Sequence, residues 1–137
     1  MKKVFLDTNI LIYYVDNEDY RELAEIIVEL GRVGKIELYA SYLSFANMAY
    51  VFRKKTVDER FRLLNMAKGV VTVLPCDSTQ LDNALKVKVK DFEDVLQFQC
   101  AKSFGCDALI TNNKKDFTHF TDISIFTPEE FLLNLSL

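Results

Sequence analysis

The sequence is poor in the residues that build flexible or disulfide-rich chains: its 137 residues include four Gly, two Pro and three Cys. So few Gly and Pro exclude collagen-like repeats and give no sign of a flexible linker. The Cys are odd in number and lack C-x-x-C spacing, and the one His, His119, falls where we expect a surface loop. A Cys/His zinc site and a nucleophile activated by His are therefore both disfavoured.

Positive charge and long apolar runs are also scarce. Lys and Arg number 17 against 20 Asp and Glu, so the formal net charge is −3, and any RNA contact must come from local basic patches. No segment reaches the roughly 20 apolar residues that span a bilayer. The start, Met1-Lys2-Lys3 and an apolar stretch, looks like a secretion signal, but Asp7 interrupts it and no small-residue cleavage site follows. We expect a cytoplasmic protein without a membrane partner.

What is present is an alternation of short apolar strands and amphipathic helices. Half of the residues are hydrophobic, which suits one core and one domain over residues 1–137. The expected strands are 4–6, 36–40, 70–74, 108–111 and 123–126. The expected helices are 10–14, 20–32, 42–55 (capped by Ser41), 57–68, 78–87, 92–104 and one that begins at 127–130. This order predicts an α/β fold with a mostly parallel five-stranded sheet.

Acidic and amide side chains follow these strands or open the helices after them. In a parallel sheet, ligands bind beyond the carboxyl ends of the strands. The residues that we expect there are Asp7, Asn47, Asp91, Asp94, Asn112, Asn113 and Asp116. Clustered carboxylates repel one another, so a cation between them stabilises the cluster, and oxygen ligands suit Mg²⁺ or Mn²⁺. No Gly-rich phosphate loop is found, so we expect no nucleotide cofactor.

Four segments resemble, in order, the motifs of the PIN-domain family of metal-dependent ribonucleases. Residues 4–9 (VFLDTN) resemble its opening strand and first acid. Residues 44–52 (SFANMAYVF) are similar to its second motif, and residues 90–97 (KDFEDVLQ) to its third, DFEDALQ in one bacterial branch. Residues 109–117 (LITNNKKDF) are similar to its fourth, a strand that ends in T-x-D or T-x-N. The resemblance covers essentially the whole chain and implies a three-layer α/β/α sandwich.

The resemblance implies a divalent-metal-dependent endoribonuclease, often the toxin of a toxin–antitoxin pair. Carried over to this chain, the metal ligands are Asp7, Asp94 and Asp91, and with Asp116 these are the expected catalytic acids. The implied second-sphere or weak ligands are Thr8, Asn9, Asn47, Thr111 and Asn113. The implied partners are an RNA substrate, Mg²⁺ or Mn²⁺, an antitoxin protein and a second copy of the chain.

Two positions depart from the family pattern. Asn47 stands where the second acid is usual, and Asn113 stands at the T-x-D position. An amide oxygen can ligate a cation, but it adds no charge and cannot serve as a base. Two hypotheses follow: an active ribonuclease in which Asp91 and Asp116 replace the missing charge, or a degenerate PIN domain that binds RNA or protein without cutting. A dehalogenase-type phosphatase also begins with an Asp after a strand, but it needs an acid where Asn9 stands.

Several of these residues also fit ordinary structural roles. Asp7 suits a turn cap, and Asp91 suits a helix N-cap with Asp94 as an acid in the first turn. Asn47 is either a buried hydrogen-bonded amide or a weak ligand. The candidate RNA-binding residues are Lys88, Lys90, Lys114 and Lys115, although such clusters are more often solvated faces. The alternation over residues 86–90 predicts an extended segment with three lysines on one side.

Overall fold

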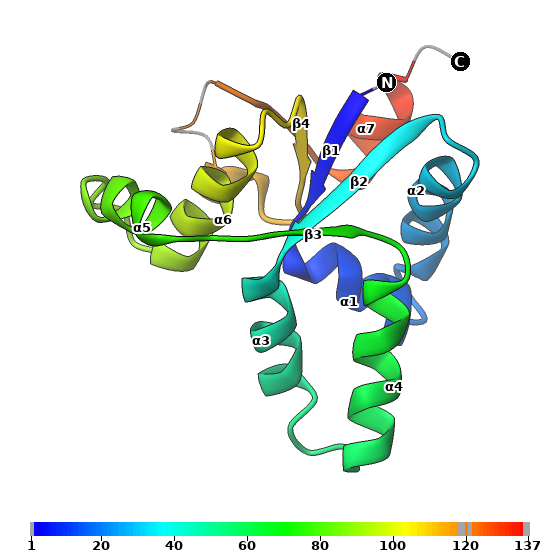
Figure 1. Cartoon of the computed structure of the whole chain (residues 1–137). Helices are drawn as coiled ribbons and strands as arrows, with labels where there is room; N and C mark the ends of the chain where they lie inside the picture. Colours follow the sequence, from blue (N-terminus) through cyan, green and yellow to red (C-terminus); the bar gives the residue numbers. More distant parts are fainter. Residues whose placement is uncertain (1, 118–119, 121, 136–137) are drawn as a thin grey trace.

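The sheet lies at the centre of the molecule, and all five of its strands are parallel (Figure 1). The computed structural model describes residues 2–117, 120 and 122–135, so His119 lies outside the described residues. The strands are β1 (Lys2–Leu6), β2 (Ile36–Ser41), β3 (Thr72–Leu74), β4 (Ala108–Ile110) and β5 (Ser124–Phe126). Their order in the sheet is β3-β2-β1-β4-β5. The predicted α/β fold with a parallel five-stranded sheet is confirmed.

The helices mostly occupy the segments that hydrophobic periodicity predicts. They are α1 (Thr8–Asp16), α2 (Arg21–Arg32), α3 (Tyr42–Val51), α4 (Val57–Lys68), α5 (Ser78–Leu85), α6 (Phe92–Ser103) and α7 (Pro128–Leu133). A short 3₁₀ helix, η1 (Lys114–Phe117), was not predicted. The expectation that the third helix reaches residue 55 is wrong, because turns follow Val51 before Thr56 caps α4 with a bond to the Glu59 amide.

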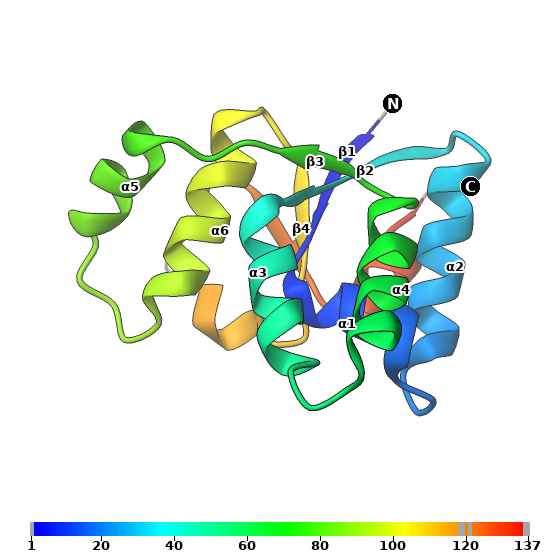
Figure 2. The same cartoon turned by 60° about the horizontal axis from the view of Figure 1, so that its bottom comes forward.

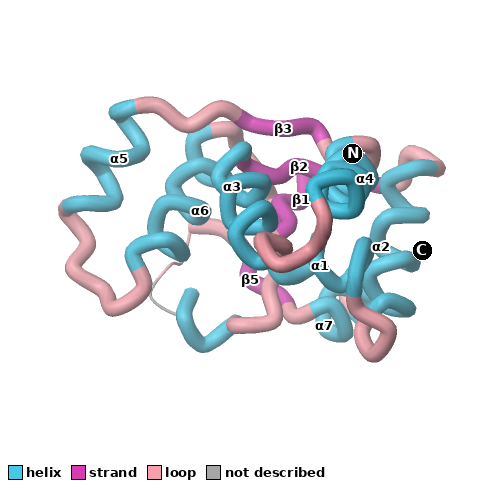
Figure 3. Tube along the Cα trace, turned by 90° about the horizontal axis from the view of Figure 1, so that it is seen from below, coloured by secondary structure: helices cyan, strands magenta, loops and turns pink. Residues whose placement is uncertain are grey.

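The two faces of the sheet carry separate cores because side chains alternate along a strand. On β1, Val4 and Leu6 pack into a core formed with α1, α2, α4 and α7, whereas Phe5 packs into a second core against α6. On β4, Ile110 joins the first core and Leu109 the second. Helices therefore cover both faces, as the three-layer sandwich requires, and Figure 3 shows the strands between them.

The chain adds strands first on one side of β1 and then on the other. From β1 the chain moves to β2 and β3 on one side, and later to β4 and β5 on the other, so β1 and β4 flank a topological switch point. The Asp7 amide donates to the Ile110 carbonyl (3.0 Å), which keeps the ends of these two strands together. Figure 2 shows α3, α6 and the orange turn of η1 around the carboxyl edge of the sheet.

Within the described residues, no helix has the length and apolar character needed to cross a membrane.

Candidate active site

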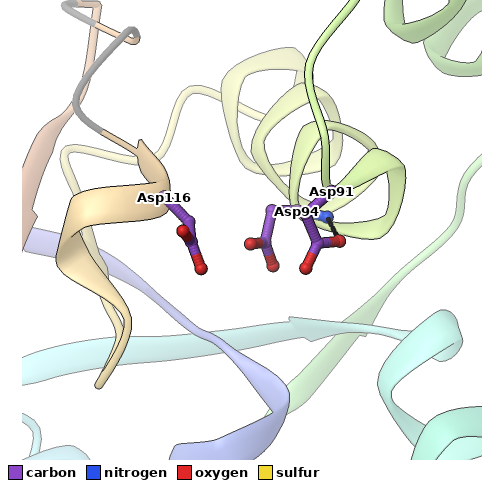
Figure 4. A group of neighbouring side chains, drawn as sticks. All are labelled: Asp91, Asp94 and Asp116. Atoms are coloured by element: carbon purple, nitrogen blue, oxygen red, sulfur yellow. Dashed lines mark hydrogen bonds between the residues drawn. The ribbon is translucent and has the colours of Figure 1, made fainter.

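Three carboxylates converge beyond the carboxyl edge of the sheet. Asp91, Asp94 and Asp116 each offer an oxygen, and these oxygens all lie within 4.8 Å of one another (Figure 4). The first two come from the start of α6 and the third from η1. The fold thus brings Asp116 close to two acids that lie more than twenty residues before it in the sequence.

Asp91 holds its place by capping α6. Its Oδ1 accepts a hydrogen bond from the backbone amide of Asp94 (3.2 Å), as an N-cap side chain does. The partial positive charge at the start of a helix also favours acids in the first turn. The capping role and the position within the acidic cluster therefore coexist in one side chain.

Asp94 is the most constrained member of the cluster. Only 6% of its surface is exposed, and its Oδ2 has no hydrogen-bond partner among the described residues. Burial, followed by the negative charges of Asp7, Asp91, Asp116 and Glu93, raises the pKa of Asp94 from 3.8 to about 8. A buried carboxylate oxygen without a donor is costly, so this atom is well placed to bind a cation.

Asp7 approaches the same cleft from the end of β1. Its Oδ1 accepts from the Thr8 amide (2.8 Å) and its Oδ2 from the Thr111 hydroxyl (2.8 Å). Burial raises the pKa of Asp7, the two hydrogen bonds lower it, and the charges of Asp91 and Asp116 raise it again. Asp7 therefore caps α1, as the structural alternative predicts, and also lines the acidic cleft.

The amide residues surround a cleft of about 350 Å³ that Asp7, Asp91 and Asp94 also line. Asn47 is half-buried, and its Nδ2 donates to the Glu93 carboxylate (2.5 Å). Asn9 accepts from the amide of Asn112 (3.4 Å), and the amide of Asn113 donates to the Thr111 hydroxyl (3.0 Å). These contacts order the rim of the cleft.

A buried polar network supports the floor of the site, and sequence reasoning missed it. Gln97 on α6 is fully buried. Its Oε1 accepts from the Ser41 hydroxyl (2.6 Å), and its Nε2 donates to the hydroxyls of Ser44 (2.9 Å) and Thr8 (3.2 Å). Ser41 precedes α3 as predicted, but its hydroxyl binds Gln97 instead of capping the helix. The signal in the sequence was a Gln one helical turn after Asp94.

The predicted RNA-binding lysines lie in different settings. Lys90 and Lys115 line a cleft of about 560 Å³ that adjoins the acids and shares Asp91 and Asn113 with the smaller cleft. Lys88 is exposed. Lys114 pairs with Glu130 at 2.9 Å.

The segment that leads to α6 differs from its expected conformation. Lys86, Lys88 and Lys90 are exposed while the two valines between them are half-buried, as alternation predicts. However, the Val89 amide donates to the Val87 carbonyl (3.1 Å). The chain therefore bends at Lys88, and the prediction of an extended segment is wrong.

The donor set suits a hard divalent cation. Each of the three clustered side chains offers a carboxylate oxygen, the ligand type that Mg²⁺ and Mn²⁺ prefer. Among the residues that the structure describes, none donates a hydrogen bond to the buried Oδ2 of Asp94, and the pKa of the same residue is raised, so a negative charge at this point is poorly compensated by them. The residues present therefore fit a divalent-cation site.

Residues 3–115 match the PIN domain family, so the chain belongs to it. It is similar to ribonuclease VapC1 of Aquifex aeolicus (strain VF5), with 25% identity over 138 residues that cover 95% of this chain and 93% of the relative. A recognised ribonuclease is thus among its relatives.

Solved structures agree with this fold. The structure of VapBC2 from Rickettsia felis, bound to a DNA fragment from its promoter, superposes with a TM-score of 0.72 at 16% identity, covering 90% of this chain and 96% of the other. A toxin–antitoxin complex from Klebsiella pneumoniae gives a TM-score of 0.67 at 22% identity, covering 91% and 97%.

Proposed function

We propose that this protein is a divalent-metal-dependent endoribonuclease of the toxin type, which hydrolyses phosphodiester bonds of RNA. The single observation that carries the proposal is the convergence of Asp91, Asp94 and Asp116 within 4.8 Å at the carboxyl edge of a PIN-domain sheet. Ribonuclease VapC1, a relative along nearly the whole chain, supports the reaction class.

In this proposal Asp94, Asp91 and Asp116 hold Mg²⁺ or Mn²⁺, and Asp7 completes the site from the end of β1. When bound, such an ion lowers the pKa of a water and stabilises charge at the phosphoryl group. Thr8 and Thr111 orient the carboxylate of Asp7 through their hydrogen bonds. Lys90 and Lys115 face the adjoining cleft, where they contact the phosphate backbone, a contact that does not depend on base sequence.

The test compares the wild type with Asp94→Asn by Mn²⁺ calorimetry and by cleavage of a labelled single-stranded RNA. The substitution keeps the size of the side chain and removes the charge, so we expect loss of at least about tenfold in Mn²⁺ affinity and loss of cleavage. Asp82→Asn is the matched control, because Asp82 is exposed on α5, outside the acidic cleft. Full cleavage by Asp94→Asn would overturn the proposal.

A second function, a PIN domain that binds RNA or protein without cutting, is favoured by two observations. Asn47 and Asn113 both line the cleft as neutral amides. This function predicts that the wild type binds no Mn²⁺ at millimolar concentration and that the double change Asn47→Glu with Asn113→Asp creates binding. Tight Mn²⁺ binding by the unmodified protein argues against it.

The proposal extends to partners and location. One solved relative is a toxin–antitoxin complex, and we infer an antitoxin partner here. A second copy suits the apolar side chains exposed on α3 and α4, which include Tyr50 (66%), Val57 (61%) and Phe61 (56%). The three cysteines are free thiols, which agrees with a reducing cytoplasm.

A further inference from the structure

Asn47 on α3 contacts an acid of the cleft, although it is itself a neutral amide. The Nδ2 of Asn47 donates to Oε1 of Glu93 at 2.5 Å, and both residues line the cleft beside Asp7, Asp91 and Asp94. Glu93 lies on α6, 46 residues from Asn47 in the sequence. The contact therefore holds the carboxylate of Glu93, on α6, at the cleft. It lies beside Asn47, the position on α3 where the sequence resemblance implies an acid.

We propose that Glu93 supplies the carboxylate that position 47 lacks, so that the cation site takes this acid from α6, with Asn47 as the residue that positions it. This inference rests on the proposed metal-dependent activity and adds a binding residue to the same site. It also assigns a specific role to the departure at position 47: an amide can donate to Glu93, whereas a carboxylate there would repel it.

Three observations support the inference independently of one another. The buried Oδ2 of Asp94, the residue next to Glu93, has no partner among the described residues, so the cleft contains an oxygen that is open to a cation. Glu93 lines the same cleft as Asp7 and Asp91. Its place in the first turn of α6 stabilises a negative charge there even before a cation binds.

The test exchanges the two side chains. Calorimetry with MnCl₂ compares the wild type, Glu93→Gln, Asn47→Ala and the double variant Asn47→Glu with Glu93→Gln. We expect Glu93→Gln to weaken Mn²⁺ binding about tenfold or more and Asn47→Ala to weaken it by less. The double variant moves the acid back to α3 and leaves an amide on α6 to donate to it, so we expect affinity within about threefold of the wild type.

Glu25→Gln is the matched control, since Glu25 is exposed on α2, far from the acids in the sequence. Thermal unfolding of each metal-free variant shows whether the chain still folds. A carboxyl ¹³C resonance of Glu93 that shifts with Mg²⁺ in the wild type is a second readout, which needs no activity.

The outcomes separate this inference from the proposed function. The inference alone is overturned if Glu93→Gln keeps wild-type Mn²⁺ affinity and the Glu93 resonance of the wild type does not shift with Mg²⁺, while Asp94→Asn loses binding. A double variant as weak as Glu93→Gln contradicts the role of Asn47. A wild-type protein that binds no Mn²⁺ overturns the inference and the proposed function together.

Discussion

At the scale of single residues, the site is a set of acids that the fold holds closer than their charges favour. Asp94 shows this most clearly: its surface is almost fully buried, and one of its oxygens lacks a partner within the described part of the chain. Asp7 differs, because both of its oxygens accept hydrogen bonds from threonines. The protein therefore satisfies one acid internally and leaves the other dependent on protonation or on a cation.

The raised pKa of Asp94 predicts a pH dependence of stability in metal-free protein. In the unfolded chain this carboxyl ionises near 3.8, whereas in the fold its pKa is about 8. Between these values the folded state binds more protons, so stability falls as pH rises. We expect Asp94→Asn to remove this loss and to melt about 3–8 °C higher than the wild type at pH 8, with a smaller difference at pH 5.

Thermal melts in EDTA at pH 5, 6.5 and 8 measure this effect. Asp82→Asn serves again as the control, because Asp82 is exposed on α5, outside the acidic cleft. If the difference in melting temperature between Asp94→Asn and the wild type stays constant from pH 5 to pH 8, the effect cannot be assigned to Asp94.

At the scale of elements, one buried side chain joins three segments of the fold. Gln97 links α6 to Thr8 at the start of α1 and to Ser41 and Ser44 at the start of α3. A further bond from the Thr8 hydroxyl to Ser44 (2.9 Å) closes the network. Since Asp94 lies one turn before Gln97 and Asp7 adjoins Thr8, this network sets the spacing of the acids.

We expect Gln97→Leu to lower the free energy of unfolding by about 2–4 kcal/mol, because it removes three buried hydrogen bonds and leaves the Ser41 hydroxyl without its partner. Mn²⁺ affinity falls as well, since α6 loses its tie to the other two segments. Gln99→Leu is the matched control: the same substitution on the same helix, at a residue also buried but outside the network. Urea unfolding measures the stability of both variants. Equal losses in the free energy of unfolding would refute the special role of Gln97.

At the scale of the whole molecule, charge is distributed unevenly around the acidic cleft. The formal net charge is −3, so long-range attraction does not bring RNA to the protein. Lys90 and Lys115 nevertheless line the cleft next to the acids. In the proposed function, RNA binding then depends on these local contacts and, where a cation is bound, on its positive charge.

This distribution predicts that two lysines close in sequence to the acids contribute unequally to RNA binding. Lys90→Ala reduces the slope of log affinity against log salt by about 0.7, the value for one phosphate contact on a single strand. Lys114→Ala changes it less, because its ammonium pairs with Glu130. Fluorescence anisotropy with a labelled single-stranded RNA, in the Asp94→Asn background, measures both. Equal slopes for the two variants would show that neither lysine has a preferred contact.

Much of the fold and part of the site followed from local patterns in the sequence. Alternating apolar strands and helices with capping residues predict the parallel sheet, because strand and helix periods are properties of short segments. The acids after β1, at the start of α6 and in η1 were also predictable, since ligands gather beyond the carboxyl ends of parallel strands. Asp91 and Asp94 share a helix face by spacing alone.

The tertiary structure decided which side chains meet across long stretches of the chain. The contact between Asn47 and Glu93, and the network of Gln97 with Ser41, Ser44 and Thr8, join residues 36 to 89 positions apart. No local pattern encodes such a meeting, because it depends on how α3 and α6 pack around the sheet edge. The sequence by itself therefore determined the family, the strand order along the chain and most of the acids. Only packing decided which acid is buried without a partner among the described residues and which amide faces a carboxylate.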